Sequence, residues 1–330
     1  MNISEFISSY PVILAPMSGI TDFPFRSLVK ELGSGLLISE MIASRAMIIQ
    51  TKQSLQKSQI HANTAVQLAG CDPVIMAEAA QLNEDMGAKI IDINFGCPIK
   101  KVVNSYAGSA LMKDEITATK ILESVVKAVN IPVTLKMRTG WDNNNLNSPK
   151  LAKIAEESGI KMITIHGRTR AQMFTGKADW KFISHIKKCV KIPIIVNGDI
   201  KSLDDVKKSL EESQADGIMI GRGAYGKPWI INQALQFIKS GTILPDPLPS
   251  EKLQIITKHY DHMIEYYGQD IGVKISKKHI GWYSSSLDNS AEFRAQVNSS
   301  NDYQFIRDKI IDFSQEISIL NINAFLQRIF

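Results

Sequence analysis

Short apolar runs rich in β-branched residues recur along roughly the first 230 residues, and each is followed by a polar residue, a loop and a stretch with helical spacing. Runs of this length predict buried strands, and the stretches between them predict helices. The eight predicted strands are 12–15, 35–39, 64–68, 90–94, 133–137, 162–166, 193–197 and 217–220. Four predicted helices have recognisable first residues, namely Asp22 with Pro24, Asp72 before Pro73, Ser148 before Pro149, and the capping box from Ser202 to Asp205.

The alternation of strands and helices predicts the fold class. It indicates a parallel sheet, because each connection between parallel strands needs a crossover that is usually helical. Eight such units predict a closed (β/α)8 TIM barrel, whose usual length is about 250 residues. Beyond residue 249 the strand pattern stops, and amphipathic spacing over residues 251–320 has room for four helices. We therefore predict a barrel over residues 1–243, a proline-rich linker over 244–250 and a small all-α helical domain over 251–330.

Composition limits the cellular setting and the kind of site. The three cysteines, Cys71, Cys97 and Cys189, have spacings that match neither a disulfide framework nor a CxxC metal site. We therefore expect a reducing compartment and no metal centre. The N-terminus lacks a basic region followed by a long apolar run, and no window of about 18 residues resembles a membrane helix. We expect a soluble, cytoplasmic protein without a membrane anchor, and a monomer.

The net charge of +5 is mild, and the C-terminal region as a whole is not basic. Residues 251–330 carry nine Lys and Arg against ten Asp and Glu. A polyanionic partner would therefore have to be bound by local clusters. The candidate clusters are Lys274, Lys277, Lys278 and His279, and the surface around Arg168, Arg170 and Lys177. Both clusters are also compatible with an ordinary solvated face.

The segment GRGAYG, residues 221–226, matches the dinucleotide-binding pattern G-x-G-x-x-G. In a Rossmann fold it would follow the first strand, but here it follows the last, and Asp246 lies in a proline-rich segment instead of at a strand end. A barrel instead binds phosphate at the loops after strands seven and eight. We therefore predict a phosphate site at Gly221, Arg222 and Gly223, in preference to a plain tight turn.

Polar side chains stand at nearly every predicted strand end, and in a barrel these ends converge on one face. The strand-end residues are Pro16, Met17 and Ser18; Glu40; Gln67; Asn94 and Cys97; Lys136 and Arg138; His166 and Arg168; Asn197 and Asp199; and Gly221 and Arg222. A single polar residue of this kind could simply mark where a strand leaves the core for solvent. Polar residues at eight strand ends instead predict a ligand-binding site. Amide and cationic donors together with a phosphate cradle suit a planar phosphorylated ligand such as flavin mononucleotide (FMN).

The segment DINFGCP, residues 92–98, carries the candidate reactive group. Apolar residues alternate with Asp92 and Asn94, which predicts a strand with one polar face. Gly96 then allows the backbone to turn before Cys97. Taken alone, Cys97 is compatible either with a buried structural cysteine or with a thiol at the site.

Seven motifs follow one another along the chain: APMSGITDFPFR, QLAG, DINFGCPIKK, LKMRTGW, IHGRTR, NGDI and GRGAYGKPW. In this order and spacing they resemble the tRNA-dihydrouridine synthases, most of all the bacterial B-type subfamily, and KKHIGWY extends the resemblance towards the C-terminus. The resemblance implies an FMN-dependent enzyme that uses NADPH or NADH to reduce the C5–C6 double bond of a D-loop uridine in tRNA, at position 17. It also implies a hydride from FMN N5 to C6 and a proton from Cys97 to C5.

The same resemblance implies roles for individual residues. Cys97 is the implied catalytic residue, and His166 an implied contact of the flavin or the substrate. The implied FMN contacts are Pro16, Met17, Ser18, Gln67, Lys136, Asn197, Gly198, Asp199, Gly221 and Arg222. The candidate tRNA contacts are Asn94, Lys100, Lys101, Arg138 and Arg168 at the barrel, and Lys274, Lys277, Lys278 and Tyr283 in the helical domain, which the resemblance makes the tRNA-recognition domain. For Tyr283 and the adjacent Trp282, a place in the core of that domain is the alternative.

One stretch departs from the family pattern. After the thiol the family often has Asn-Arg or further basic residues, whereas Val103, Asn104 and Ser105 occur here. Only Lys100 and Lys101 therefore remain as basic candidates in this loop. Two other functions stay open: an FMN-dependent reductase of a free pyrimidine, of the dihydroorotate or dihydropyrimidine type, and a non-enzymatic tRNA-binding protein.

Overall fold

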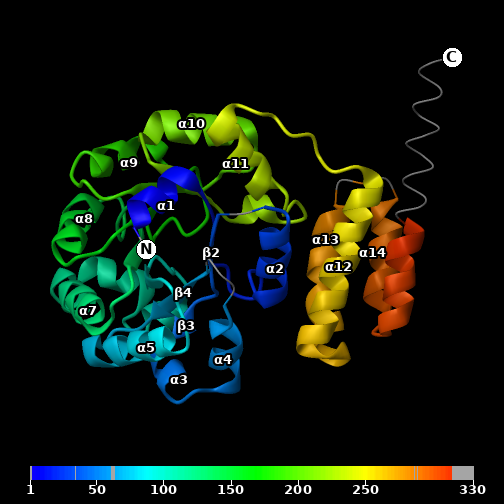
Figure 1. Cartoon of the computed structure of the whole chain (residues 1–330), viewed down its shortest axis with the longest axis horizontal. Coiled ribbons are helices and arrows are strands. Elements are labelled where there is room, and N and C mark those ends of the chain that lie inside the picture. Colours follow the sequence, from blue (N-terminus) through cyan, green and yellow to red (C-terminus); the bar gives the residue numbers. More distant parts are fainter. Residues whose placement is uncertain (1, 34, 61–63, 286, 288, 314–330) are drawn as a thin grey trace.

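The computed structural model describes residues 2–33, 35–60, 64–285, 287 and 289–313, and contains a barrel ringed by helices with a helical lobe beside it (Figure 1). The barrel strands are β1 (Val12–Leu14), β2 (Leu36–Ile38), β4 (Thr64–Ala69), β5 (Ile91–Phe95), β6 (Val133–Arg138), β7 (Ile163–His166), β8 (Ile194–Asn197) and β9 (Gly217–Ile220). These eight parallel strands form a closed ring, because β1 pairs with both β2 and β9 and β2 also pairs with β4. A short strand, β3 (Ile42–Ala43), pairs with β4 beyond the end of β2. The predicted (β/α)8 barrel is confirmed.

Helices cover the outside of the barrel (Figure 1). They are α2 (Phe23–Glu31), α3 (Ser44–Ile48), α4 (Lys52–Ser58), α5 (Pro73–Asp85), α7 (Glu115–Ala128), α8 (Ser148–Glu157), α9 (Trp180–Lys187), α10 (Leu203–Ser213) and α11 (Ile230–Ser240). Three further short helices are α6 (Lys100–Val103), η1 (Gly108–Lys113) and η2 (Arg222–Ala224). The predicted caps Asp22, Asp72 and Ser202 are confirmed at α2, α5 and α10. At α8 the helix begins at Ser148, as predicted, although the N-cap position is occupied by Asn147.

Alternate residues of each strand face opposite sides of the barrel wall. Outward side chains such as Ile91 and Ile93 pack with the surrounding helices in one large apolar cluster. Inward side chains at the N-terminal end of the barrel are also apolar, as at Ile195. Further along the strands the inward positions become polar, and Asp92 and Asn94 bond to side chains of neighbouring strands there. The polar face that the alternation predicts for this strand is therefore confirmed.

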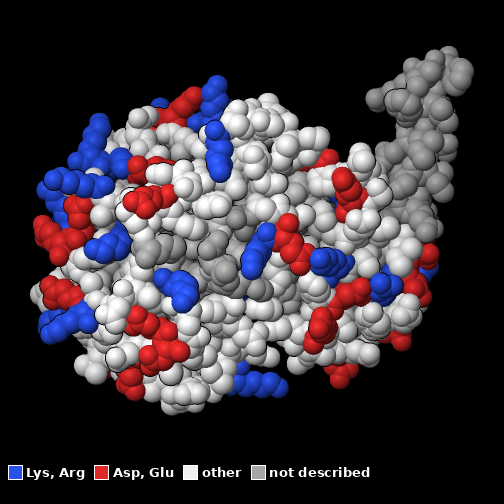
Figure 2. Space-filling view, viewed as in Figure 1, with Lys and Arg blue, Asp and Glu red and all other residues white. Residues whose placement is uncertain are grey.

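The N-terminal end of the barrel is closed by α1 (Ile3–Ser9). Ile3 and Ile7 pack among the inward side chains Ile13, Ile195 and Met219. In Figure 1 this helix lies across the ring of strands. Positive and negative side chains are intermixed over this face of the barrel (Figure 2). A site inside the barrel must therefore open at the opposite end, where the strands end.

The C-terminal lobe contains α12 (Pro249–Tyr267), α13 (Gln269–Ser284), α14 (Ser290–Ser299) and a fourth helical stretch over residues 303–313, as predicted. Its core is formed by Tyr260, Val273, Ile280, Phe293 and Ile306. In the parts of the chain that the structure describes, no helix has the length and apolarity needed to cross a membrane.

The lobe rests on α2 of the barrel (Figure 1). Apolar side chains of α2 and α12 share a small buried cluster with Trp229 and Tyr283. At its edge the Tyr267 hydroxyl donates a 2.9 Å hydrogen bond to the buried carboxylate of Asp22. The same carboxylate caps α2 by accepting from the Phe25 N–H. The Asp22 side chain therefore contributes both to the start of α2 and to the docking of the lobe.

A chain of hydrogen bonds crosses the polar interior of the barrel. The N–H groups of Gly96 and Cys97 donate to Asn94 Oδ1 at 3.0 and 2.9 Å. Because these donors are fixed, the Asn94 amide nitrogen donates to Gln67 Oε1 at 2.8 Å, and the Gln67 amide nitrogen donates to Asp92 Oδ2 at 2.7 Å. The other oxygen of this carboxylate accepts from a threonine hydroxyl of β6. These bonds determine the orientation of both side-chain amides in the series, those of Asn94 and Gln67.

This orientation predicts the effect of Asn94→Asp, which keeps size but replaces the donating amide by an acceptor. The second carboxylate oxygen of this variant would face Gln67 Oε1, so two acceptors would meet. If the Gln67 amide flipped to relieve this, its oxygen would instead face the Asp92 carboxylate. We expect the free energy of unfolding at pH 7 to fall by about 2 kcal/mol or more. The deficit should shrink at pH 5, since protonating one carboxyl restores a donor. Urea unfolding measures both values. Asn104→Asp, at an exposed position, should change stability by less than about 0.5 kcal/mol; equal stability of Asn94→Asp and wild type would refute the assigned orientation.

A second prediction concerns the pH dependence of lobe docking. Burial raises the pKa of Asp22 to about 6, although the bonds from Phe25 and Tyr267 oppose the rise. The folded state therefore binds this proton more tightly than the unfolded chain, and stability is lost as pH rises from about 4 to about 6. Asp22→Asn keeps a good cap without this loss. Relative to wild type it should gain up to about 3 kcal/mol between pH 4 and pH 7. Asp72→Asn is the control for the change of capping residue itself. A difference in the free energy of unfolding between Asp22→Asn and wild type that did not vary with pH would contradict the argument.

Candidate active site

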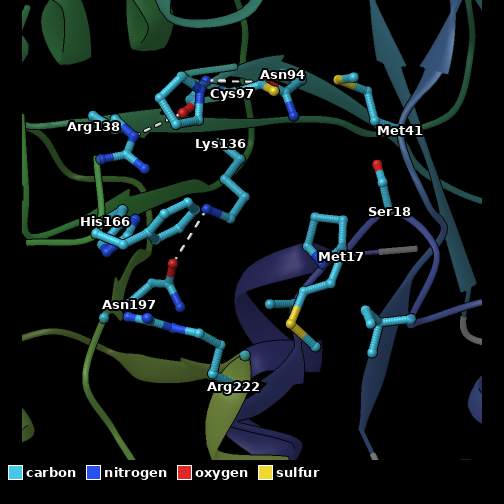
Figure 3. A pocket seen from close by; sticks show the side chains of 18 of the residues that line it. Met17, Ser18, Met41, Asn94, Cys97, Lys136, Arg138, His166, Asn197 and Arg222 are labelled. Atoms are coloured by element: carbon cyan, nitrogen blue, oxygen red, sulfur yellow. Dashed lines mark hydrogen bonds between the residues drawn. The ribbon is translucent and has the colours of Figure 1, made fainter. Parts of the chain in front are cut away.

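A cavity of about 370 Å³ opens at the C-terminal ends of the strands. Figure 3 shows Met17, Cys97, Lys136, Asn197 and Arg222 arranged around it. The sequence-predicted residues that line it are Pro16, Met17, Ser18, Gln67, Asn94, Cys97, Lys136, Arg138, His166, Asn197, Gly198, Asp199, Gly221, Arg222 and Gly223. The fold thus brings together residues from the ends of seven strands, β1 and β4 to β9, and the loops that follow them.

Strand register places the polar side chains next to one another. Asn94 of β5 pairs with Lys136 of β6. Arg138, His166 and Asn197 occupy paired positions on β6, β7 and β8. The Lys136 ammonium donates to Asn197 Oδ1 at 3.2 Å, across the strand between them (Figure 3). Because all these positions face inward, their polar atoms meet in the same cavity.

Cys97 is held at the wall of this cavity by its backbone. Its N–H donates to Asn94 Oδ1, and its carbonyl accepts from the Ser109 hydroxyl at 2.8 Å. Arg138 Nε donates to the preceding carbonyl, that of Gly96, at 2.8 Å. Burial raises the pKa of the thiol, although the Ile99 N–H and the nearby cations oppose this. The cysteine is therefore protonated at neutral pH and can donate a proton.

Positive charge dominates the cavity. Burial, and then the neighbouring Arg138, lower the pKa of Lys136 to about 8, so it remains mostly protonated at neutral pH. Burial also lowers the pKa of Arg138, to about 10. Arg222 is 43% exposed and lies 3.6 Å from the Asp199 carboxylate. Since Asp199 already pairs with Arg168 at 2.6 Å, the cavity keeps an excess of positive charge that suits an anionic ligand.

His166 is neutral, and its tautomer follows from its neighbour. Burial and the surrounding cations lower its pKa well below the usual value. Arg168 Nη1 lies 3.3 Å from His166 Nε2. A guanidinium only donates, so Nε2 accepts and the ring proton is on Nδ1. Within the described residues nothing forms a hydrogen bond to Nδ1, so this N–H is available to a ligand.

Two glycines allow close contacts here, Gly198 with His166 of β7 and Gly223 of the loop after β9 with the loop after β8. Gly198 has φ +115°, and a Cβ there would lie 2.7 Å from the His166 ring. A Cβ at Gly223 would lie 2.3 Å from the carbonyl of Ile200. The Arg222 guanidinium emerges beside this backbone, an arrangement typical of phosphate sites. No group of three His, Cys, Asp or Glu suited to a metal ion occurs among the residues described.

Arg168 does not reach the cavity. It is only 2% exposed, and it donates to the carbonyls of Thr175 and Gly176 as well as to Asp199. The structure therefore corrects the prediction of a substrate contact, because all these bonds hold the loop after β7 in place. Lys100 and Lys101 are exposed on α6, directly after the Cys97 turn.

The lysines predicted on the lobe differ in their surroundings. Lys274 is exposed. Lys277 bonds within the lobe, to residues at and beyond the end of α14. The Lys278 ammonium donates to the carbonyl of Gly19, in the loop that follows β1. This contact places α13 beside the mouth of the cavity.

The aromatic residues of the lobe correct two further expectations. Tyr283 and His279 are buried, so the alternative prediction of a core position is the right one for Tyr283, and His279 adds no surface charge. Trp282 stacks on Tyr225, with ring centroids 4.1 Å apart and planes 13° apart. Tyr225 and Phe174 line the cavity but were missed from the sequence. Tyr225 lies within the GRGAYG motif and could have been found, whereas Phe174 belongs to a loop without a motif.

Comparison with known proteins agrees with this architecture. Among solved structures, the chain is similar to histamine dehydrogenase from Rhizobium sp. 4-9, with a TM-score of 0.52 and 14% identity over 76% of this chain and 49% of that one. At this identity the likeness concerns the fold alone.

Sequence relatives are much closer. A protein of Rickettsia bellii named "Probable tRNA-dihydrouridine synthase" is 59% identical over 92% of this chain and 94% of its own length. The "tRNA-dihydrouridine synthase B" of Pseudomonas aeruginosa is 46% identical over 88% of this chain and 89% of its own. The family model described as dihydrouridine synthase (Dus) matches residues 13–318. This chain belongs to the dihydrouridine synthase family.

Proposed function

We propose that the chain is an FMN-dependent tRNA-dihydrouridine synthase of the B type, which uses NADPH to reduce the C5–C6 double bond of a D-loop uridine at position 17. The observation that carries the proposal is the position of Cys97, a thiol whose pKa is raised by burial, on the wall of a cationic cavity. Every residue to which the family resemblance assigns an FMN contact lines the same cavity. Family membership and the names of the relatives support the reaction class.

The residues around the cavity fit FMN. The backbone of Gly221 and Gly223 and the Arg222 guanidinium would hold the phosphate. Lys136 and Asn197 would hold the polar part of the ring. When bound and reduced, FMN supplies the hydride that uracil C6 receives. With a pKa of about 8, Lys136 is cationic at neutral pH and would stabilise negative charge on the bound cofactor.

Cys97 would supply the proton that uracil C5 requires. A hydride added at C6 leaves an electron pair that a general acid must protonate at C5. Burial keeps the Cys97 thiol protonated at neutral pH, as this role demands. Asn94 fixes the turn through the Gly96 and Cys97 N–H groups, so the acid is held in position before the substrate arrives.

The helical lobe would orient the tRNA. A uridine of a folded tRNA must be extruded to enter a cavity at the end of a barrel. Because Lys278 contacts Gly19, the lobe borders the mouth where such an RNA would approach. Exposed Lys274 on the same helix, together with Lys100 and Lys101 near the thiol, would bind phosphates. A reductase of a free pyrimidine would need neither the lobe nor these lysines.

The first test compares substrates for the full-length protein. Supplied with FMN and NADPH, it should form dihydrouridine at one D-loop position of an unmodified tRNA. Free uridine, UMP and orotate should be reduced with a kcat/KM at least about 100-fold lower, because the remote binding energy is missing. Nucleoside mass spectrometry and position mapping give the result. Comparable turnover of a free pyrimidine would favour the alternative reductase, and colourless protein that cannot be reconstituted with FMN would favour non-enzymatic tRNA binding.

The second test addresses the proton donor. Cys97→Ala should retain bound flavin and its reduction by NADPH, yet lose about 100-fold or more of dihydrouridine formation, as expected for a general acid. Stopped-flow absorbance follows the reduction, and single-turnover assays follow the product. Cys189→Ala, at a cysteine after α9, is the matched control and should behave as wild type. Full activity in Cys97→Ala would exclude the assigned role.

A further inference from the structure

The segment that follows the thiol folds back onto it. Gly108, with φ +61°, lies so close that a Cβ there would be 3.0 Å from the Cys97 carbonyl oxygen and 3.1 Å from the Cys97 Cβ. Buried Ser109 donates to the same carbonyl with its hydroxyl, at 2.8 Å, and with its N–H, at 3.1 Å. Residues 98–107 therefore form a loop whose two ends are both fixed to the backbone of Cys97.

Tyr106 stands on the return of this loop in an unfavourable conformation. Its φ of +55° lies in the left-handed region that residues with bulky side chains rarely adopt. The return is held by bonds from the Tyr106 N–H to the Val103 carbonyl and from the Ala107 N–H to the Val102 carbonyl, at 2.9 and 3.2 Å. The side chain is nevertheless 77% exposed. Packing within the chain therefore does not explain why tyrosine occupies this position, and such strained residues cluster at functional sites.

The surface around Tyr106 has the composition of an RNA contact. Ile99 is 51% exposed and also lines the cavity. Lys100 and Lys101 are exposed, and the segment 93–113 contains no Asp or Glu. Local positive charge attracts phosphates, and an exposed aromatic ring stacks on unpaired bases. We refer to Ile99, Lys100, Lys101 and Tyr106 as the thiol-loop surface.

We propose that the thiol-loop surface binds the tRNA strand beside the target uridine, with Tyr106 stacked on a flanking unpaired base and Lys100 and Lys101 on adjacent phosphates. This inference rests on the proposed function, because its ligand is the RNA that presents the uridine to Cys97. Extruding a uridine leaves its neighbours unstacked, and a ring anchored to the backbone of the proton donor can receive one of them.

The test is Tyr106→Asn, which removes the ring but suits the left-handed backbone. We expect the Kd for an unmodified tRNA transcript, and its KM, to rise about tenfold, as for the loss of one stacked base. Reduction of bound flavin by NADPH should be unchanged, and the Tm equal or higher because the backbone strain is relieved. Tyr106→Phe keeps the ring and should remain within about twofold of wild type.

Salt dependence separates stacking from charge. Lys101→Ala should lower the slope of log Kd against log salt by about one, the contribution of one phosphate contact. Tyr106→Asn should weaken binding at every salt concentration without changing the slope. Tyr10→Ala is the matched control, because Tyr10 is an exposed ring at the opposite end of the barrel, before β1. It should bind tRNA as wild type does.

The outcomes distinguish this inference from the proposed function. Wild-type affinity and turnover in Tyr106→Asn would overturn the inference and leave the proposed function intact. If the wild-type protein forms dihydrouridine in no tRNA, the proposed function fails. In that case the Kd for the tRNA transcript still tests the stacking contact. A tenfold loss of affinity in Tyr106→Asn, with wild-type affinity in Tyr106→Phe, supports the contact, and equal affinities of all three proteins overturn it.

Discussion

The open end of the barrel depends on how polar side chains are satisfied inside it. A barrel interior excludes water, so an amide or carboxylate there destabilises the fold unless it finds a partner. Asp92, Gln67 and Asn94 bond to one another, and the N–H groups of Gly96 and Cys97 complete the chain. The bonds that make the interior stable are therefore the bonds that fix the thiol. Scaffold and site cannot be varied independently at these positions.

Much of this arrangement follows from the sequence because it rests on two regular patterns. The period of two along each strand gives the inward positions of Asp92 and Asn94, and barrel closure brings all strand ends to one face. Neither pattern says what a side chain will bond to once it arrives. Arg168 stands at a strand end, as predicted, but the carbonyls of its own loop take up its donors. Tyr283 is buried because its helix docks on α2, a contact between segments far apart in sequence.

The lobe and the cavity are joined more closely than a linker and a separate domain would imply. Tyr225, which lines the cavity, stacks on Trp282 of the lobe. A Cβ at Gly226 would lie 2.4 Å from the carbonyl of Trp282, so the loop after β9 and α13 touch through their backbones. Lys278 adds a second contact near the mouth, at Gly19. A molecule bound on α13 therefore contacts an element that is packed directly against the cavity wall.

The electrostatics of the cavity favour an anionic ligand. Burial works against the charged forms of Lys136 and Arg138, and a neighbouring cation adds to that cost for each, Arg138 for Lys136 and Arg168 for Arg138. Burial, together with the same positive field, lowers the pKa of His166 and keeps it neutral. An anionic group bound beside Arg222 would offset this positive field. It would raise the pKa of Lys136, which the neighbouring cations lower, because a negative charge favours the protonated amine. Binding of an anionic ligand and protonation of Lys136 are therefore coupled, because each stabilises the other. A neutral ligand of the same shape would leave the repulsion between the buried cations unbalanced.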